Sequence, residues 1–112
     1  MDSKEVLKEY FGYDSFRAGQ EDIINAILEK KDVLAIMPTG AGKSLCYQVP
    51  AMMLSGITVV ISPLISLMQD QVKSLNDVGI NAAYVNSTLS ESEIDGTLNM
   101  VLNGIYKIIC LL

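Results

Sequence analysis

Histidine is absent from this 112-residue sequence, and cysteine and basic side chains are scarce. Without histidine, the chain cannot perform acid–base or triad chemistry of the histidine type, and two cysteines are too few for a zinc site of the usual Cys/His kind. We expect Cys46 and Cys110 to be reduced core residues. Only eight residues are Lys or Arg and the net charge is −5, which argues against a strong, non-specific grip on nucleic acid.

Long apolar runs are also missing. Half of the residues are apolar, but every run is interrupted by Gly, Pro, Ser or a charge well before the about 18 residues that could span a bilayer. No basic segment precedes an apolar one at the N-terminus, so we expect no signal peptide. The length suits one small domain, and the sequence predicts a cytoplasmic protein with no membrane partner.

The most informative segment is Met37-Pro-Thr-Gly-Ala-Gly-Lys-Ser44. It follows the apolar run Val33-Leu-Ala-Ile36 and precedes a predicted helix that opens at Ser44, which is the strand–loop–helix context of a phosphate-binding loop. Its glycines permit backbone conformations in which N–H groups turn toward phosphates. Lys43 can then reach the β- and γ-phosphates, and the Ser44 hydroxyl can bind Mg²⁺.

This segment departs from the usual pattern G-x-x-x-x-G-K-[ST], because Met37 stands at the first glycine. The rest of the pattern and its context agree with a nucleotide site, to which the next helix would add the positive end of its dipole. The alternative interpretation is a glycine-rich turn that happens to contain Gly-Lys-Ser.

Alternating apolar runs and helical patterns predict an α/β fold with a parallel sheet. Ser3 and Gly12 would begin and end the first helix, Pro50 should kink or shorten the third, and Ser90 to Glu93 form a capping box. Helices are predicted over residues 3–11, 19–30, 44 onward, 65–78 and 90–102, and strands over 32–37, 57–62, 81–85 and 106–112. We expect strand 57–62 to be buried, since its β-branched run is continuous.

Polar residues follow two of these strands. Ser62 and Pro63 follow the second strand, and Asn86 and Ser87 follow the third. Ligands of parallel sheets bind at the carboxyl ends of the strands, so these residues and the phosphate loop should share one edge. The alternative interpretation is a strand end and an ordinary turn.

A second polar group precedes the phosphate loop. The amide of Gln20 can pair with the N6 amino group and N7 of adenine, Tyr13 could stack on the base, and Arg17 could lie over it. Taken alone, Arg17 and Gln20 are better explained as solvated polar side chains, with Phe11 and Phe16 in the core; the neighbouring phosphate loop favours the nucleotide site.

Together, these motifs resemble the N-terminal part of the helicase core of RecQ DNA helicases. The quoted segments are Leu7-x₃-Phe11-Gly12-x₃-Phe16-Arg17-x₂-Gln20, Met37 to Gln48, Val60 to Val72 and Tyr84-Val-Asn-Ser-Thr88. The resemblance implies a partial RecA-like P-loop fold. It places a helical adenine-motif segment at residues 1–31 and an incomplete ATP-binding lobe at residues 32–112.

The resemblance also implies an enzyme that couples ATP hydrolysis to 3′–5′ DNA unwinding in recombination and repair, with single-stranded or forked DNA as partner and a nucleoid location in a bacterium. Lys43 is the catalytic candidate and Ser44 the Mg²⁺ ligand, while Ser62, Pro63, Asn86 and Ser87 would lie near DNA. The implied ATP-binding residues are Tyr13, Arg17, Gln20, Met37, Pro38, Thr39, Gly40, Ala41, Gly42, Lys43, Ser44 and Leu45.

The 112 residues contain no Asp-Glu-Ala-His segment and no second lobe. We therefore expect the front part of a longer protein or a truncated product that binds ATP without unwinding DNA, and that associates through exposed apolar edges. Two alternatives remain: a non-catalytic nucleotide-binding protein, or another small P-loop ATPase or kinase.

Overall fold

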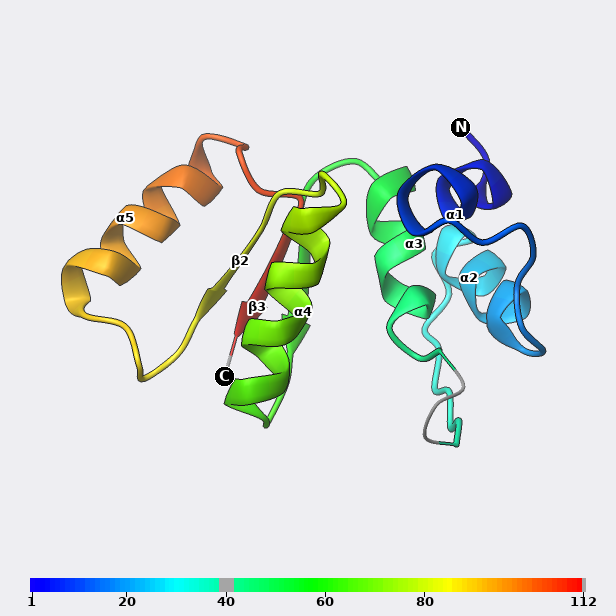
Figure 1. The fold of residues 1–112 in the computed structure, drawn as a ribbon, viewed down its shortest axis with the longest axis horizontal. Helices are drawn as coiled ribbons and strands as arrows, with labels where there is room; N and C mark the ends of the chain where they lie inside the picture. The colour runs from blue at the N-terminus through cyan, green and yellow to red at the C-terminus, as the bar shows by residue number, and fades with distance from the viewer. Residues whose placement is uncertain (39–41, 112) are drawn as a thin grey trace. The chain divides into compact units, whose positions relative to one another are not determined.

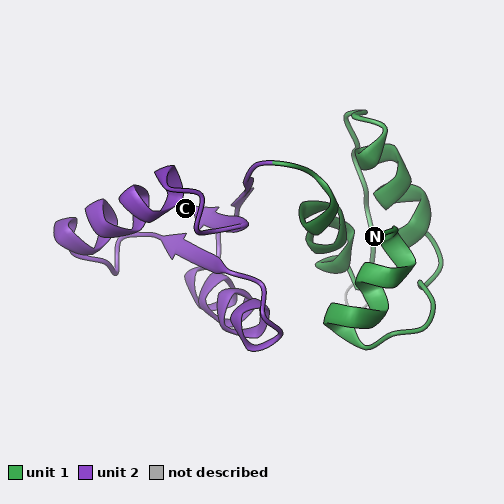
Figure 2. Ribbon diagram, turned by 90° about the horizontal axis from the view of Figure 1, so that it is seen from above, with its two compact units in different colours: residues 1–55 green, residues 56–112 purple. Residues whose placement is uncertain are grey.

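The chain forms two compact units, residues 1–55 and residues 56–112 (Figure 2). The computed structural model describes residues 1–38 and 42–111. Each unit has its own secondary structure and its own core, and each is described by itself below. The functional division into residues 1–31 and 32–112 stays a prediction.

The described part of the first unit consists of three helices around a small apolar core. These are α1 (Ser3–Phe11), α2 (Gln20–Leu28) and α3 (Leu45–Met53) (Figure 1). One apolar face of each helix meets at the centre, where the fully buried core side chains are Val6, Leu7, Ile24 and Val49. Larger, half-buried side chains surround them, including Phe11 and Phe16. Both phenylalanines are therefore structural.

The ends of α1 show one correction to the predicted caps. The carboxylate of Asp2, not the hydroxyl of Ser3, accepts a hydrogen bond from the backbone N–H of Glu5 at 2.9 Å. Both are good capping residue types, but Ser3 already has helical geometry as the first residue of α1. Gly12 ends the helix with a φ of 76°, as predicted.

The predicted strand over residues 32–37 is wrong. Residues 31–38 have no regular secondary structure, and the described part of the first unit contains no strand. A strand needs a neighbour for its backbone hydrogen bonds, and an apolar β-branched run cannot supply that neighbour itself. As a result, Leu34 and Ile36 are 89% and 91% exposed.

Helix α3 begins directly after Ser44, close to the predicted start. Pro50 lies inside it, and the helix ends three residues later at Met53. Proline has no N–H for the helical ladder, yet α3 continues through Pro50, and the Leu54 N–H donates to the Pro50 carbonyl oxygen at 2.9 Å; the predicted shortening stays a prediction.

The second unit is a three-stranded parallel sheet with helical connections. Along the chain it runs β1 (Thr58–Ile61), α4 (Ile65–Asp77), β2 (Ala82–Val85), α5 (Glu91–Leu102) and β3 (Ile108–Leu111). The spatial order is β1-β3-β2, so the last strand lies in the middle (Figure 1). This confirms the predicted α/β class and parallel sheet.

The two outer strands end level with each other. Ile61 of β1 and Val85 of β2 are both register partners of Leu111 in β3. Met68, Val72 and Leu75 of α4 are buried, and α4 contacts β2. The Asn76 side chain both donates to the carbonyl oxygen and accepts from the N–H of Ala82, at 3.2 and 3.0 Å, which fixes the start of β2.

Strand β1 is not fully buried, contrary to the prediction. Its side chains alternate, and Val59 and Ile61 are 52% and 80% exposed. The strand lies at an edge of the sheet, with β3 as its only neighbour among the described residues. Its other edge therefore offers unpaired backbone groups beside apolar side chains.

Within the described residues, no helix has both the length and the apolar character needed to cross a bilayer.

The capping box of α5 forms as predicted. The Ser90 hydroxyl accepts from the N–H of Glu93 at 3.2 Å, and the Glu93 carboxylate accepts from the N–H of Ser90 at 3.0 Å. The hydrogen bond from the Ser90 backbone, followed by that from its side chain, lowers the pKa of Glu93 below its ordinary value of 4.5.

Replacing Glu93 should make the free energy of unfolding less dependent on pH in the acidic range. Because the pKa of Glu93 is lowered by folding, its contribution to the free energy of unfolding is fully present above about pH 4.5 and is lost as the pH falls through the lowered value. Glu93→Ala should therefore be less stable than the parent chain at pH 7, and the difference should shrink at pH 3. Urea titrations at both pH values measure it.

The matched control is Glu91→Ala, which removes a carboxylate from the same first turn but leaves the capping box intact. An equal loss of stability in the two variants at pH 7 would show that the box adds nothing beyond charge near the helix N-terminus.

Candidate nucleotide-binding site

The described part of the phosphate loop belongs to the first unit. Met37 and Pro38 precede Thr39, Gly40 and Ala41, which lie outside the described residues, and Gly42 follows them. Lys43 and Ser44 then form the turn that enters α3, with Leu45 as its first residue. The loop residues therefore lead into a helix N-terminus, where backbone N–H groups and the helix dipole favour anions.

Lys43 and Ser44 have the chemistry that a nucleotide triphosphate requires. Lys43 is exposed, so its ammonium group can reach a bound phosphate. Within the described residues, the Ser44 side chain makes no capping hydrogen bond to α3, although Ser44 is the N-cap residue. An ammonium group and a hydroxyl at adjacent positions fit phosphate and Mg²⁺. The structure describes no cluster of three acidic, Cys or His side chains that could hold a metal.

Gln20 joins the predicted adenine segment to the phosphate loop. Its Nε2 donates to the Gly42 carbonyl oxygen at 3.0 Å, and its Oε1 accepts from the backbone N–H of Arg17 at 2.7 Å. The residue is 1% exposed, although it is the first residue of α2. The sequence predicted that Gln20 and the loop serve one site, but it gave no sign that they touch.

Gly42 is required at its position for two reasons. Its φ is 79°, in the region that side chains disfavour. In addition, a Cβ at this position would stand 2.3 Å from Nε2 of Gln20. Any other residue would therefore strain the backbone and displace the amide.

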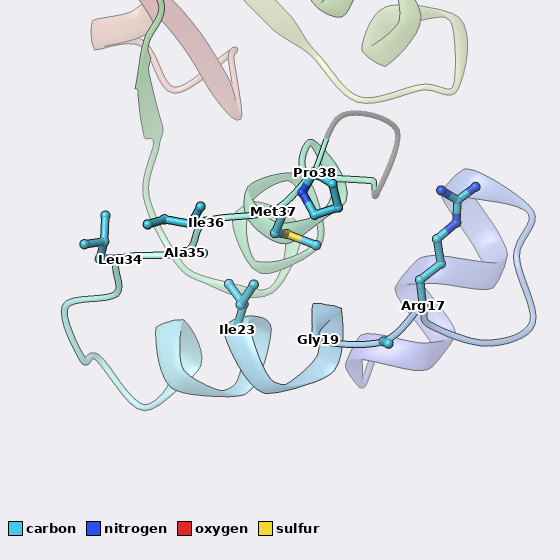
Figure 3. Close-up of a pocket in the computed structure, with 9 residues that line it drawn as sticks. Arg17, Gly19, Ile23, Leu34, Ala35, Ile36, Met37 and Pro38 are labelled. Atoms are coloured by element: carbon cyan, nitrogen blue, oxygen red, sulfur yellow. The ribbon is translucent and has the colours of Figure 1, made fainter.

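A pocket of about 540 Å³ lies between the segment before α2 and the segment before the phosphate loop (Figure 3). Most of its lining is apolar, and Arg17 is the one charged residue among the lining residues. It is lined by Arg17, Ala18, Gly19, Ile23, Leu34, Ala35, Ile36, Met37 and Pro38. The size and lining suit a flat, largely apolar group such as a base. Gln20 is not part of the lining.

The other predicted adenine residues are exposed. Tyr13 is 52% exposed and does not line this pocket, whereas Arg17 does. Figure 3 shows Arg17 on the side of the α2 N-terminus, with the apolar segment 34–38 opposite Ile23. The structure thus brings Arg17, Met37 and Pro38 to one pocket.

Cys46 is a neighbour of the loop that the sequence analysis placed only in the core. Its Sγ lies 3.9 Å from the Met37 sulfur and 4.0 Å from the Gly42 carbonyl oxygen. Burial raises the pKa of the Cys46 thiol, and burial also raises the pKa of Cys110. Both cysteines are buried and free, as predicted. The raised pKa keeps them protonated and unreactive.

The predicted DNA-contacting residues lie at one edge of the sheet in the second unit. Ser62 and Asn86 directly follow the level ends of β1 and β2, as expected for parallel strands. Both are buried, whereas Pro63 and Ser87 are exposed. That the phosphate loop shares this edge stays a prediction, since the described residues before the loop form no strand.

Asn86 has a clear structural role. Its Oδ1 accepts from the backbone N–H of Thr88 at 2.8 Å and from the Thr88 hydroxyl at 2.5 Å, while its Nδ2 faces the Met68 sulfur at 3.5 Å. This arrangement closes the turn after β2, in the way that asparagine side chains commonly do.

The sequence model of the DEAD/DEAH box helicase family matches residues 17–111, and the chain belongs to this family. The match includes Gln20, the phosphate loop and all three strands.

Within that family the chain is similar to RecQ proteins. It is 53% identical over 107 residues to the ATP-dependent DNA helicase RecQ of Bacillus subtilis. The aligned region covers 95% of this chain and 18% of that protein. It is 51% identical over 104 residues to the RecQ protein of Haemophilus influenzae, covering 93% and 17%. With the RecQ protein of Synechocystis the identity is 46% over 90 residues, and the aligned region covers 80% of this chain and 19% of that protein. The chain spans less than a fifth of the length of these relatives.

Removing the Asn86 side chain should destabilise the second unit. Asn86→Ala removes a buried side chain and leaves the N–H of Thr88 without its partner, so we expect a loss of about 1–3 kcal/mol in the free energy of unfolding. The adjacent Ser87→Ala, at an exposed position, should change it by less than about 0.5 kcal/mol. Equal stability of the two variants in urea titrations would contradict the structural role of Asn86.

Proposed function

We propose that the chain binds ATP through the phosphate loop and the Gln20 segment, as the ATP-binding part of a RecQ-like 3′–5′ DNA helicase. The observation that carries this proposal is the hydrogen bond between Gln20 and Gly42, since it unites two separate sequence motifs in one site. Relatives that are about half identical are named ATP-dependent DNA helicases, which supports ATP as the ligand.

In this proposal, Arg17 and the apolar segment 34–38 hold the adenine ring, and Tyr13 reaches it from an exposed position. Lys43 and the α3 N-terminus bind the phosphates, and Ser44 binds Mg²⁺, which would neutralise phosphate charge. The remaining loop residues, Thr39, Gly40 and Ala41, would supply backbone N–H groups.

Hydrolysis and unwinding need groups that these 112 residues do not contain. Phosphoryl transfer in such enzymes uses an acidic metal ligand and an arginine finger, and unwinding uses two lobes that close and open. We therefore infer that the 112 residues bind ATP without separating strands. In a longer protein, Pro63 and Ser87 are the better candidates for DNA contact, because Ser62 and Asn86 are buried.

Lys43→Ala should weaken ATP binding but not adenosine binding. The variant loses the charged group that faces the β- and γ-phosphates, and a charge-assisted hydrogen bond contributes about 1.5–3 kcal/mol, so we expect about 10- to 100-fold weaker ATP binding. Calorimetry with ATP and with adenosine measures both. Lys31→Ala, which removes another exposed lysine of the first unit, is the control. If Lys43→Ala binds ATP as tightly as Lys31→Ala, the loop is merely a turn.

We also propose that the edge of β1 mediates self-association of the chain. Val59 and Ile61 are exposed along an edge whose backbone groups can pair with a strand of a second copy.

Ile61→Lys should reduce this association, because a charged side chain on an edge strand disfavours pairing. Leu102→Lys is the matched control, since Leu102 is similarly exposed, at 84%, but lies at the end of α5. Sedimentation velocity over a concentration series should show a larger monomer fraction for Ile61→Lys alone. A parent chain that is monomeric throughout the series would contradict the proposal.

A further inference from the structure

The orientation of the Gln20 amide is determined by its partners. The backbone N–H of Arg17 can only donate and the Gly42 carbonyl can only accept, so Oε1 must face Arg17 and Nε2 must face Gly42. This amide is buried and absent from the lining of the neighbouring pocket. Both ends of the Gln20 amide thus contact the protein backbone.

The hydrogen bond to Gly42 also constrains the next residue. The Gly42 carbonyl and the Lys43 N–H belong to one planar, trans peptide group, in which the C=O and N–H bonds point in opposite directions. When Nε2 of Gln20 holds the carbonyl at 3.0 Å, the Lys43 N–H is directed away from Gln20. The peptide precedes α3, where backbone N–H groups favour a bound anion.

We propose that Gln20 is a positioning residue for phosphate, which orients the Gly42–Lys43 peptide so that the Lys43 N–H faces a bound triphosphate whether or not a base is attached. The inference rests on the proposed function and adds a role for Gln20 that is independent of adenine. Glycine at position 42 belongs to the same arrangement, because a Cβ there would stand 2.3 Å from Nε2.

Inorganic tripolyphosphate with Mg²⁺ separates this role from base recognition, since it has no adenine. Gln20→Ala should bind tripolyphosphate about fivefold more weakly than the parent chain, which corresponds to about 1 kcal/mol for one hydrogen bond. Asn25→Ala, which removes an exposed amide from the same helix, should bind as the parent chain does. Calorimetry with tripolyphosphate and with ATP gives both affinities for each variant.

Gln20→Glu gives a second test in which the side-chain shape is kept. The carboxylate can still accept from Arg17, but it places an acceptor against the Gly42 carbonyl. The ¹H–¹⁵N resonance of the Lys43 amide should shift in the ligand-free chain, while amide resonances of α1 stay in place and show that the first unit remains folded.

Three outcomes overturn the proposal. Unchanged tripolyphosphate affinity in Gln20→Ala, together with weaker ATP binding, would make Gln20 a reader of the base only. An unshifted Lys43 amide in Gln20→Glu would show that the peptide is held by other contacts. A parent chain that binds ATP but not tripolyphosphate would remove the phosphate role while leaving ATP binding intact, whereas failure to bind either ligand would overturn the proposed function as well.

Discussion

The second unit depends on the parallel pairing of β3 with both of its neighbours. β1 and β2 do not pair with each other, and each finds its partner in the last strand of the described chain. The buried segment Ile108 to Cys110 is therefore the centre of the sheet, and it follows both of its partner strands in the chain. The long sequence separation between partners means that each pairing requires a long connection to close, which is a slow route to a sheet.

The sequence predicts structure correctly where local chemistry determines local structure. Ser90 and Glu93 form the capping box, Gly12 ends α1, and the three strands of the second unit lie within a residue or two of their expected ranges. It failed where the outcome depends on a distant partner. Among the described residues, 32–37 have the composition of a strand but no strand beside them in their unit, and one face of β1 is exposed because no described element of its unit covers it.

The candidate site divides in the same way. Lys43 and Ser44 could be found from the loop pattern alone, because that pattern is contiguous in sequence. The contact between Gln20 and Gly42 spans 22 residues and depends on how α2 packs beside α3, which no spacing rule reports. The sequence also could not show that the Asn86 side chain bonds to the turn after β2. A single sequence does not distinguish an asparagine that stabilises a turn from one that binds DNA. Membership in the DEAD/DEAH box helicase family agrees with the loop, and it removes the kinase alternative.

Because Gln20 and Gly42 approach each other closely, the residues tolerated at one of these positions depend on the residue at the other. A side chain at position 42 has no room while a glutamine occupies position 20, and a shorter residue at position 20 would leave the loop carbonyl without its donor. Each single change passes through a less favourable intermediate, so drift at either position is slowed by the other. Gln20 and Gly42 belong to different motifs but constrain each other. A search pattern for such sites therefore gains specificity by requiring both residues together.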